Sequence, residues 1–267
     1  MTSSAISISG ATFSYFKTGN GFPLVFLHGF CEDHTIWNDF IIPFAEKYTV
    51  LLPDLPGFGK SGLPNQPCSI DSYADCIKAM LDAEKISSCA VIGHSLGGYV
   101  TMNFAERYGN CLSGFGLFHS FASEDDEAKK KDRERVANLV RTKGVTQFVN
   151  ELYNNLFAEE FKTENEQKIN ALKKHGAETS TAEGVAQASL AMRNRRNTIE
   201  VLKQATVPVL FIIGKEDKAI SPEKTLQQSH LPERSVISLL ENVGHMGMVE
   251  APEKCQLAIS EWLSLIS

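Results

Sequence analysis

A serine between two glycines is the residue of this sequence best placed for nucleophilic chemistry. An apolar run over residues 89–92 precedes Gly93-His-Ser-Leu-Gly97, and a helical pattern over 99–107 follows. In this strand-turn-helix context the G-x-S-x-G motif forms a sharp turn that exposes the serine hydroxyl at a helix N-terminus. Glycine at positions 93 and 97 leaves room for strand and helix to approach closely. We therefore expect Ser95 to be a nucleophile.

A serine hydroxyl needs a base to activate it and a third group to orient that base. Gly244-His245 follows the last expected strand, over 236–240, so His245 can reach the carboxyl edge of a sheet as general base. The strand over 209–213 runs into Gly214-Lys-Glu-Asp217. Loop length favours Asp217 over Glu216 as the acid. Ser95, His245 and Asp217 together predict acyl transfer.

A tetrahedral intermediate also needs two N–H donors directed at its oxyanion. Leu96, the residue after the nucleophile, should supply one. The second should come from the loop after the apolar run over 24–27, which continues as His28-Gly29-Phe30. We expect the Phe30 N–H to be this donor, with His28 and Gly29 shaping the turn. The alternative is that His28-Gly29 only ends a strand.

Short apolar runs alternate with helical patterns, which is typical of βαβ units and a mostly parallel sheet. Two half-exposed strands joined by a turn at Gly10 should form an antiparallel start. The expected fold class is α/β, with helices flanking a central sheet. The expected strands cover residues 6–8, 12–16, 24–27, 50–52, 89–92, 115–118, 209–213 and 236–240.

Only helical patterns occur for about ninety residues after 118. We interpret residues 121–203 as a helical cap over the carboxyl ends of the strands, inserted into a catalytic core formed by 1–120 and 204–267. Ser123 is the expected cap of its first helix, with Asp125 and Lys129 paired at i,i+4. Apolar residues over 145–156 form one stripe of a second helix, and Ser180 should begin a third that ends near 192.

Composition narrows the possible partners. The net charge is -6, from 26 basic and 32 acidic residues, and no basic cluster is present, so nucleic acid is not an expected partner. No run of about 18 apolar residues predicts a membrane span, and residues 1–10 do not resemble a secretory signal. The expected protein is soluble and cytoplasmic and acts on a small molecule. The six cysteines contain no C-x-x-C pair, so we expect free thiols.

With these motifs the chain resembles the α/β-hydrolase superfamily over nearly its whole length, in the cofactor-free, cap-bearing group. The resemblance includes His28-Gly29-Phe30, Gly93-His-Ser-Leu-Gly-Gly98, and a loop from Asp54 to Ser61 that is similar to D-x-x-G-x-G-x-S. The order Ser95, Asp217, His245 is the order of that family. The resemblance implies a structural turn at Asp54, with no catalytic role. Cys31 departs from the pattern, since many relatives have proline there.

The resemblance implies a serine hydrolase that cleaves a small carboxylic ester, thioester or lactone, with no metal and no organic cofactor. Similar haloalkane dehalogenases and epoxide hydrolases have aspartate in place of Ser95, so the serine argues against those two activities. The same triad also serves C–C bond hydrolysis, lyase and perhydrolase chemistry, and ligand-binding receptors share the fold. These alternatives stay open at this point. Arg193, Arg195 and Arg196 are candidates for binding a substrate carboxylate, with surface ion pairing as the alternative.

Overall fold

Eight strands form one sheet in the computed structural model, which describes residues 1–266. Their order across the sheet is β1-β2-β4-β3-β5-β6-β7-β8. The pairs β1/β2 and β2/β4 are antiparallel, and all other neighbouring pairs are parallel. The predicted α/β class, a mostly parallel sheet with an antiparallel start, is confirmed. The strands are β1 (Thr2–Ile8), β2 (Ala11–Thr18), β3 (Phe22–Leu27), β4 (Tyr48–Pro53), β5 (Cys89–His94), β6 (Leu112–Phe118), β7 (Val209–Gly214) and β8 (Ser235–Leu240).

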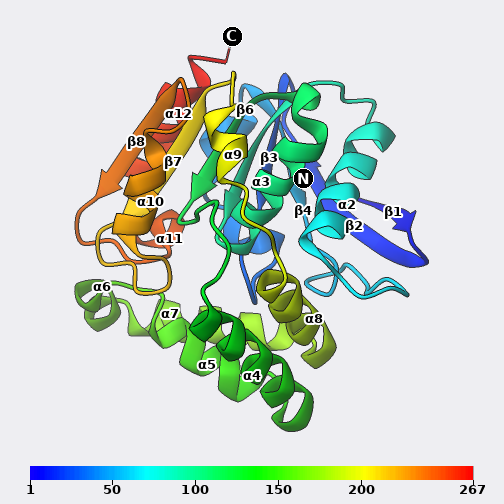
Figure 1. Cartoon of the computed structure of the whole chain (residues 1–267), viewed down its shortest axis with the longest axis vertical. Coiled ribbons are helices and arrows are strands. Elements are labelled where there is room, and N and C mark those ends of the chain that lie inside the picture. The colour runs from blue at the N-terminus through cyan, green and yellow to red at the C-terminus, as the bar shows by residue number, and fades with distance from the viewer. Residues whose placement is uncertain (267) are drawn as a thin grey trace.

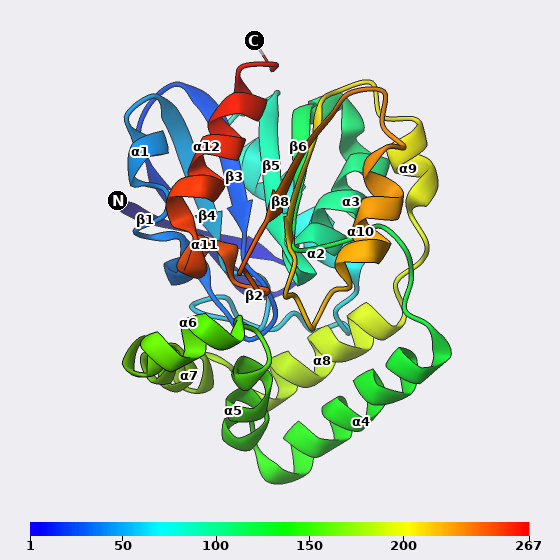
Figure 2. The ribbon, with the colours of Figure 1, turned by 90° about the vertical axis from the view of Figure 1, so that its left-hand side faces the viewer.

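Helices cover both faces of the sheet, and Figure 2 shows the two sets on opposite sides of the strands. One face carries α1 (Ile42–Ala45), α11 (Gly247–Glu250) and α12 (Pro252–Leu263). The other face carries α2 (Ile70–Ala83), α3 (Leu96–Tyr108), α9 (Ile199–Lys203) and α10 (Pro222–Ser229). Two short 3-10 turns, η1 (His34–Trp37) and η2 (Gly109–Cys111), lie in the connections.

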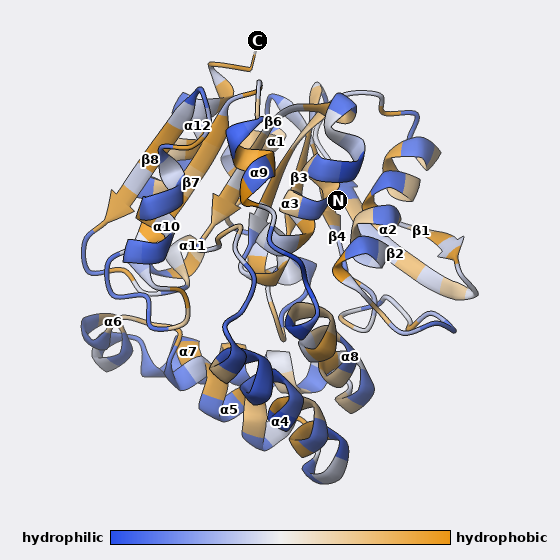
Figure 3. Ribbon diagram, viewed as in Figure 1, coloured by the Kyte–Doolittle hydropathy of each residue, from blue (hydrophilic) through white to orange (hydrophobic). Residues whose placement is uncertain are grey.

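The strands in the middle of the sheet are mostly buried because helices cover them from both sides. Every residue of β5 and of β7 is buried, as expected for parallel strands that read as continuous apolar runs. Figure 3 shows the strands of the sheet, β7 among them, coloured mostly as hydrophobic. All six cysteines are free and buried, which agrees with the expected thiols.

Between β6 and β7 the described chain forms helices and no named strand. Five of these helices lie together beyond the ends of the parallel strands, whose arrowheads point toward them (Figure 1). We call this set the helical layer. Its division from the rest as an inserted cap stays a prediction. The helical layer consists of α4 (Glu127–Lys143), α5 (Thr146–Asn154), α6 (Glu159–Glu164), α7 (Glu166–Thr179) and α8 (Ala182–Arg193).

Two helices of this layer begin later than the sequence indicated. Asp126, not Ser123, caps α4, because its side chain accepts a hydrogen bond from the Lys129 N–H. Ser123 instead bonds to Gln228 through its hydroxyl. The cap of α8 is Thr181, one residue after the predicted Ser180. The hydroxyl of Ser123, which the local pattern assigned to capping, is thus engaged by a residue far away in the sequence.

Among the described residues, no helix combines the length and the apolar character needed to cross a lipid bilayer.

Candidate active site

The turn between β5 and α3 holds Ser95 in a strained backbone conformation, with φ 50° and ψ -111°. A non-glycine residue at positive φ is costly and is characteristic of functional sites. The flanking glycines are required by close contacts. A Cβ at Gly93 would lie 2.1 Å from the Gly97 carbonyl oxygen, and a Cβ at Gly97 would lie 2.6 Å from the Leu27 carbonyl oxygen. The local sequence therefore specifies this turn.

His245 and Asp217, from the loops after β8 and β7, form a buried pair. His245 Nδ1 lies 2.7 Å from Asp217 Oδ2. The other carboxylate oxygen accepts hydrogen bonds from the Ala219 and Ile220 N–H groups, both at 2.8 Å. Burial opposes ionisation of Asp217, yet the charge and hydrogen bond of His245 hold the pKa of Asp217 below its usual value. Asp217 is therefore an ionised group that orients the His245 ring.

Ser95 and His245 line one small cavity of about 70 Å³. Among residues 1–266, the Ser95 hydroxyl makes no hydrogen bond within the protein, so it faces this space without a fixed partner. The cavity lies where the helical layer meets the ends of the strands. Its wall also includes Phe30, Tyr99, Leu152, Leu156, Met192, Ala219 and Ile220.

Phe30 lines the cavity of Ser95, and Leu96 follows Ser95 at the start of α3, while their role as oxyanion donors stays a prediction. Within the described residues neither backbone N–H donates to a protein acceptor. Cys31, the departure from the family pattern, has φ 61°, a value closed to proline. Its carbonyl accepts a hydrogen bond from the Tyr153 hydroxyl at 3.0 Å, which ties this loop to α5.

The pair Glu32–His94, which sequence reasoning did not identify, links three parts of the site. Glu32 accepts a hydrogen bond from the Gly29 N–H at 2.7 Å and lies 3.0 Å from His94 Nδ1. His94 Nε2 donates to the His245 carbonyl at 2.9 Å. Both ring nitrogens therefore donate, as in a protonated imidazole. Burial would lower the pKa of His94, but the Glu32 carboxylate raises it overall. The pair fixes the loop of Phe30 and the backbone of His245.

A second carboxylate supports the backbone on either side of His245. Glu250 accepts hydrogen bonds from the Gly244 and Met246 N–H groups at 3.0–3.1 Å and from the Ala158 N–H at 2.8 Å. The His245 N–H donates to the Leu156 carbonyl at 2.6 Å. The connection between α5 and α6 in the helical layer is thus bonded directly to the loop that carries His245.

Two clusters of buried side chains each bring three potential metal-ligand atoms to within 4.8 Å of one another. The first consists of His119, Asp217 and His245, and the second of Asp33, His34 and Asp54. In the first, burial holds the pKa of His119 well below its usual value, and its Nε2 accepts from the Gly247 N–H at 3.1 Å. In the second, Asp54 accepts from both the His34 N–H and the His34 ring. Hydrogen bonding alone accounts for both arrangements. Asp54 has the structural role that the resemblance implied.

The three arginines proposed for substrate binding are engaged in ion pairs, and none lines the cavity of Ser95. Arg196 pairs with Asp71 and Glu106 at the surface, and Arg193 lies 3.7 Å from Glu134. Arg195 is buried and lies 2.9 Å from Asp125. The alternative of surface ion pairing therefore describes Arg193 and Arg196, while Arg195 forms a buried ion pair.

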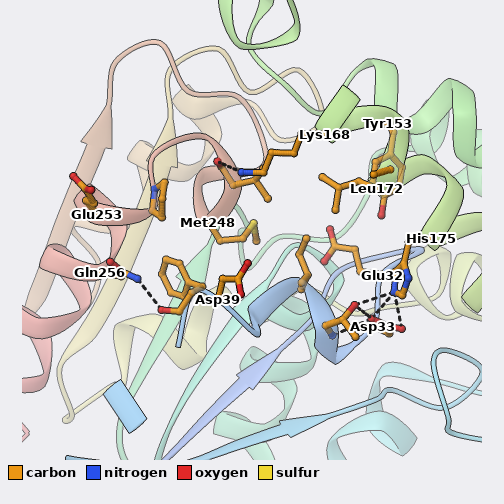
Figure 4. Close-up of a pocket in the computed structure, with 16 residues that line it drawn as sticks. Glu32, Asp33, Asp39, Tyr153, Lys168, Leu172, His175, Met248, Glu253 and Gln256 are labelled. Carbon is orange, nitrogen blue, oxygen red and sulfur yellow. Dashed lines mark hydrogen bonds and ion pairs between the residues drawn. The ribbon is translucent and has the colours of Figure 1, made fainter. Parts of the chain in front are cut away.

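A larger cavity of about 570 Å³ lies between α7, η1 and α12. Figure 4 shows Lys168, Leu172 and His175 of α7 facing Asp33, Asp39 and the α12 residues Glu253 and Gln256 across this space. Neither Ser95 nor His245 lines it. Glu32 lines both cavities, but its carboxylate is bonded to His94 and Gly29. The proposed nucleophile and the proposed base therefore both lie at the smaller cavity.

Comparison with known proteins gives a consistent result. Residues 23–252 match the alpha/beta hydrolase fold family. The structure is similar to that of a thermophilic esterase from Thermogutta terrifontis with malate bound, with a TM-score of 0.94 and 27% identity, covering 100% of this chain and 99% of the esterase. The sequence is 27% identical to 3-oxoadipate enol-lactonase 2 of Acinetobacter baylyi over 243 residues, 88% of this chain and 86% of the lactonase.

Other relatives share only part of their length with this chain. In uncharacterized proteins of Mycobacterium tuberculosis and Mycobacterium bovis, a stretch of 90 residues is 36% identical. It covers 34% of this chain and 26% of those proteins.

Proposed function

The chain belongs to the alpha/beta hydrolase fold family, and from that premise we propose that it is a serine hydrolase acting on a small carboxylic ester, thioester or lactone through an acyl-enzyme on Ser95. One observation carries the proposal: Ser95 and His245 line the same cavity, and Asp217 holds the far nitrogen of the His245 ring at 2.7 Å. Hydrolysis as the general reaction agrees with the esterase and lactonase similarities.

In the proposed mechanism His245 Nε2 removes the Ser95 proton as Ser95 Oγ attacks the substrate carbonyl. The hydrogen bond to Asp217 fixes the tautomer with the proton on Nδ1, which leaves Nε2 free to accept. The oxyanion then receives hydrogen bonds from the Phe30 and Leu96 N–H groups, which have no protein acceptor to give up. A hydrogen bond between Ser95 Oγ and His245 Nε2 is expected to form when substrate binds, since catalytic hydrogen bonds commonly tighten in the substrate complex.

The second half of the reaction uses the same groups. His245 returns its proton to the leaving alcohol, thiol or enol, and water then attacks the acyl-enzyme with His245 again as base. A cavity of about 70 Å³ is small beside the roughly 300–1,000 Å³ of pockets that bind drug-sized ligands. This supports a short acyl group.

The test is to treat the protein with a fluorophosphonate probe and to assay p-nitrophenyl esters of increasing acyl length. We expect labelling at Ser95, fastest turnover of the shortest esters, and loss of both in Ser95→Ala. Ser113→Ala, on β6 and bonded to Ser88 at the surface, is the matched control and should behave as wild type. Equal hydrolysis by Ser95→Ala would refute the proposal. Labelling without ester turnover would favour one of the other chemistries of the triad.

A further inference from the structure

We propose that Lys129 and Arg133 form an anion-binding subsite of the Ser95 cavity, so that the preferred substrate is an ester or lactone that carries a carboxylate. This inference rests on the proposed hydrolase function and specifies its substrate class. It assigns carboxylate binding to two cations of α4 and not to Arg193, Arg195 and Arg196, which the sequence offered as candidates.

Lys129 and Arg133 are positioned to reach a substrate bound at Ser95. Lys129 and Arg133 both line the cavity that contains Ser95 and His245. They are four residues apart on α4, so their side chains project from one face of the helix. Both also line an adjoining outer cavity of about 220 Å³, which shares Tyr99, Ala219 and Ile220 with the inner one. The two cations thus lie at the junction through which a substrate would extend from Ser95 toward solvent.

Arg133 shares its buried carboxylate partner with a second arginine. Its Nε lies 3.2 Å from Asp125 Oδ2, and Arg195 Nη1 lies 2.9 Å from the same oxygen. One carboxylate therefore serves two guanidinium groups. Asp125 is 4% exposed and Arg133 only 14%, so water screens the surplus charge weakly. An added anion would balance it.

Arg133 also has hydrogen-bond donors that lack a protein acceptor. Among residues 1–266 its two terminal amino groups have no hydrogen-bond acceptor, although the side chain is largely buried. A guanidinium group with free amino donors suits a carboxylate, because the two can form charge-assisted hydrogen bonds. A bound substrate carboxylate would satisfy these donors.

Lys129 adds a second, more exposed cation. Its nearest carboxylate is Asp132 at 3.9 Å, and both side chains are at least 40% exposed, so this pair is weak. Asp132 is also engaged by Arg135 at 2.7 Å. Partial burial and the like charge of Arg133 lower the pKa of Lys129. Of the other titratable groups on the inner cavity wall, Glu32 pairs with His94, and His245 is hydrogen-bonded to Asp217.

The decisive experiment compares two esters of equal size: monoethyl succinate, which carries a carboxylate, and ethyl succinamate, which carries an amide in its place. We expect wild type to have the higher kcat/KM for monoethyl succinate. In Arg133→Gln, kcat/KM for this ester should fall about tenfold to a hundredfold, the range expected for loss of a charged hydrogen bond. Turnover of ethyl succinamate should be almost unchanged.

Arg135→Gln is the matched control, because Arg135 lies on the same helix but is 65% exposed and lines neither cavity. It should keep the wild-type preference, and Arg133→Lys should keep part of it. If Arg133→Gln proves unfolded in a thermal melt, Lys129→Gln decides the question. A selective loss on monoethyl succinate supports the subsite, and an unchanged preference overturns it.

Equal losses on both esters in Arg133→Gln, or no preference in wild type, would overturn the subsite while leaving the hydrolase function in place. Failure to hydrolyse either ester, together with no labelling of Ser95 and no turnover of p-nitrophenyl esters, would refute the proposed function instead. In that case calorimetric titration of the Ser95→Ala variant with each ester still tests the subsite. Tighter binding of monoethyl succinate that is lost on adding Arg133→Gln supports it, and equal binding of the two esters overturns it.

Discussion

The loops at the carboxyl ends of the strands, which we call the sheet edge, and helix α4 hold their charged groups in different ways. At the sheet edge, Asp217, Glu32 and Glu250 each accept hydrogen bonds from backbone N–H groups of the loops they support. On α4, Arg133 shares one carboxylate with a second arginine, and Lys129 has only a weak ion pair. Figure 3 shows α4 with much hydrophilic surface, in contrast to the mostly apolar strands of the sheet.

This difference separates the proposed roles of the two regions. Groups fixed by several buried hydrogen bonds keep one geometry, which is what the steps common to all substrates need. Cations with unsatisfied donors gain most from a ligand, which is what selection among substrates needs. Changes at the sheet edge should therefore affect every substrate, and changes on α4 should affect some of them.

The largest effect should follow Asp217→Asn. An amide at this position does not hold the His245 tautomer that leaves Nε2 free to accept, so kcat should fall about 10⁴-fold for neutral and anionic esters alike. Steady-state kinetics on the two succinate-derived esters measure this. Glu216→Gln is the control, because Glu216 is the adjacent acid. A loss confined to one ester, or an equal loss in Glu216→Gln, would contradict the assignment of the acid.

A smaller effect should follow Glu32→Gln, which removes the partner of a buried imidazolium. We expect the free energy of unfolding to drop by about 3 kcal/mol, because a buried charge loses its counter-ion. We also expect kcat to fall with little change in KM, since His94 positions the His245 backbone. Urea denaturation and ester kinetics test both. Glu253→Gln, an exposed acid of the larger cavity, should change neither, and unchanged stability in Glu32→Gln would show that the pair is not a support.

Stability should also depend on pH through the same region. The charge and hydrogen bond of a histidine outweigh the effect of burial and lower the pKa values of both Glu32 and Asp217 in the folded protein. A depressed pKa contributes stability above the unfolded value, near pH 4, that is lost as pH falls through the folded pKa. Urea midpoints should therefore drop as pH is lowered past about 4. Glu32→Gln should have the shallower dependence, and an equal slope in both proteins would argue against an ionised Glu32.

The smallest effect should come from the helical layer itself. Asp126 caps α4, so Asp126→Ala should cost about 1 kcal/mol of unfolding free energy. Thermal melts measure this, with the exposed neighbour Glu127→Ala as control. Turnover of ethyl succinamate should stay at the wild-type level, because no group of the proposed triad lies on α4. A large loss on that ester would break the separation between the two regions.

Much of the candidate active site could be predicted from the sequence because the patterns that indicate it are local. The apolar runs that became β5, β7 and β8 needed only short-range periodicity to recognise. The turn at Ser95 depends on glycines two residues away on each side, whose Cβ atoms would collide with nearby backbone. His245 and Asp217 were found as residues that follow strands, and the structure places them 2.7 Å apart.

The sequence by itself thus determined the sheet and the turn that presents Ser95, since spacing over a few residues dictates both. Only the tertiary structure decided the charge partners. Glu32 meets His94 across 62 residues, and Asp125, expected to pair with Lys129 along one helix, pairs instead with Arg133 and Arg195. Ion pairs form between any groups that folding brings within a few ångströms, whatever their separation along the chain, so no local pattern specifies them. Lys129 and Arg133 were left with spare positive charge by packing alone.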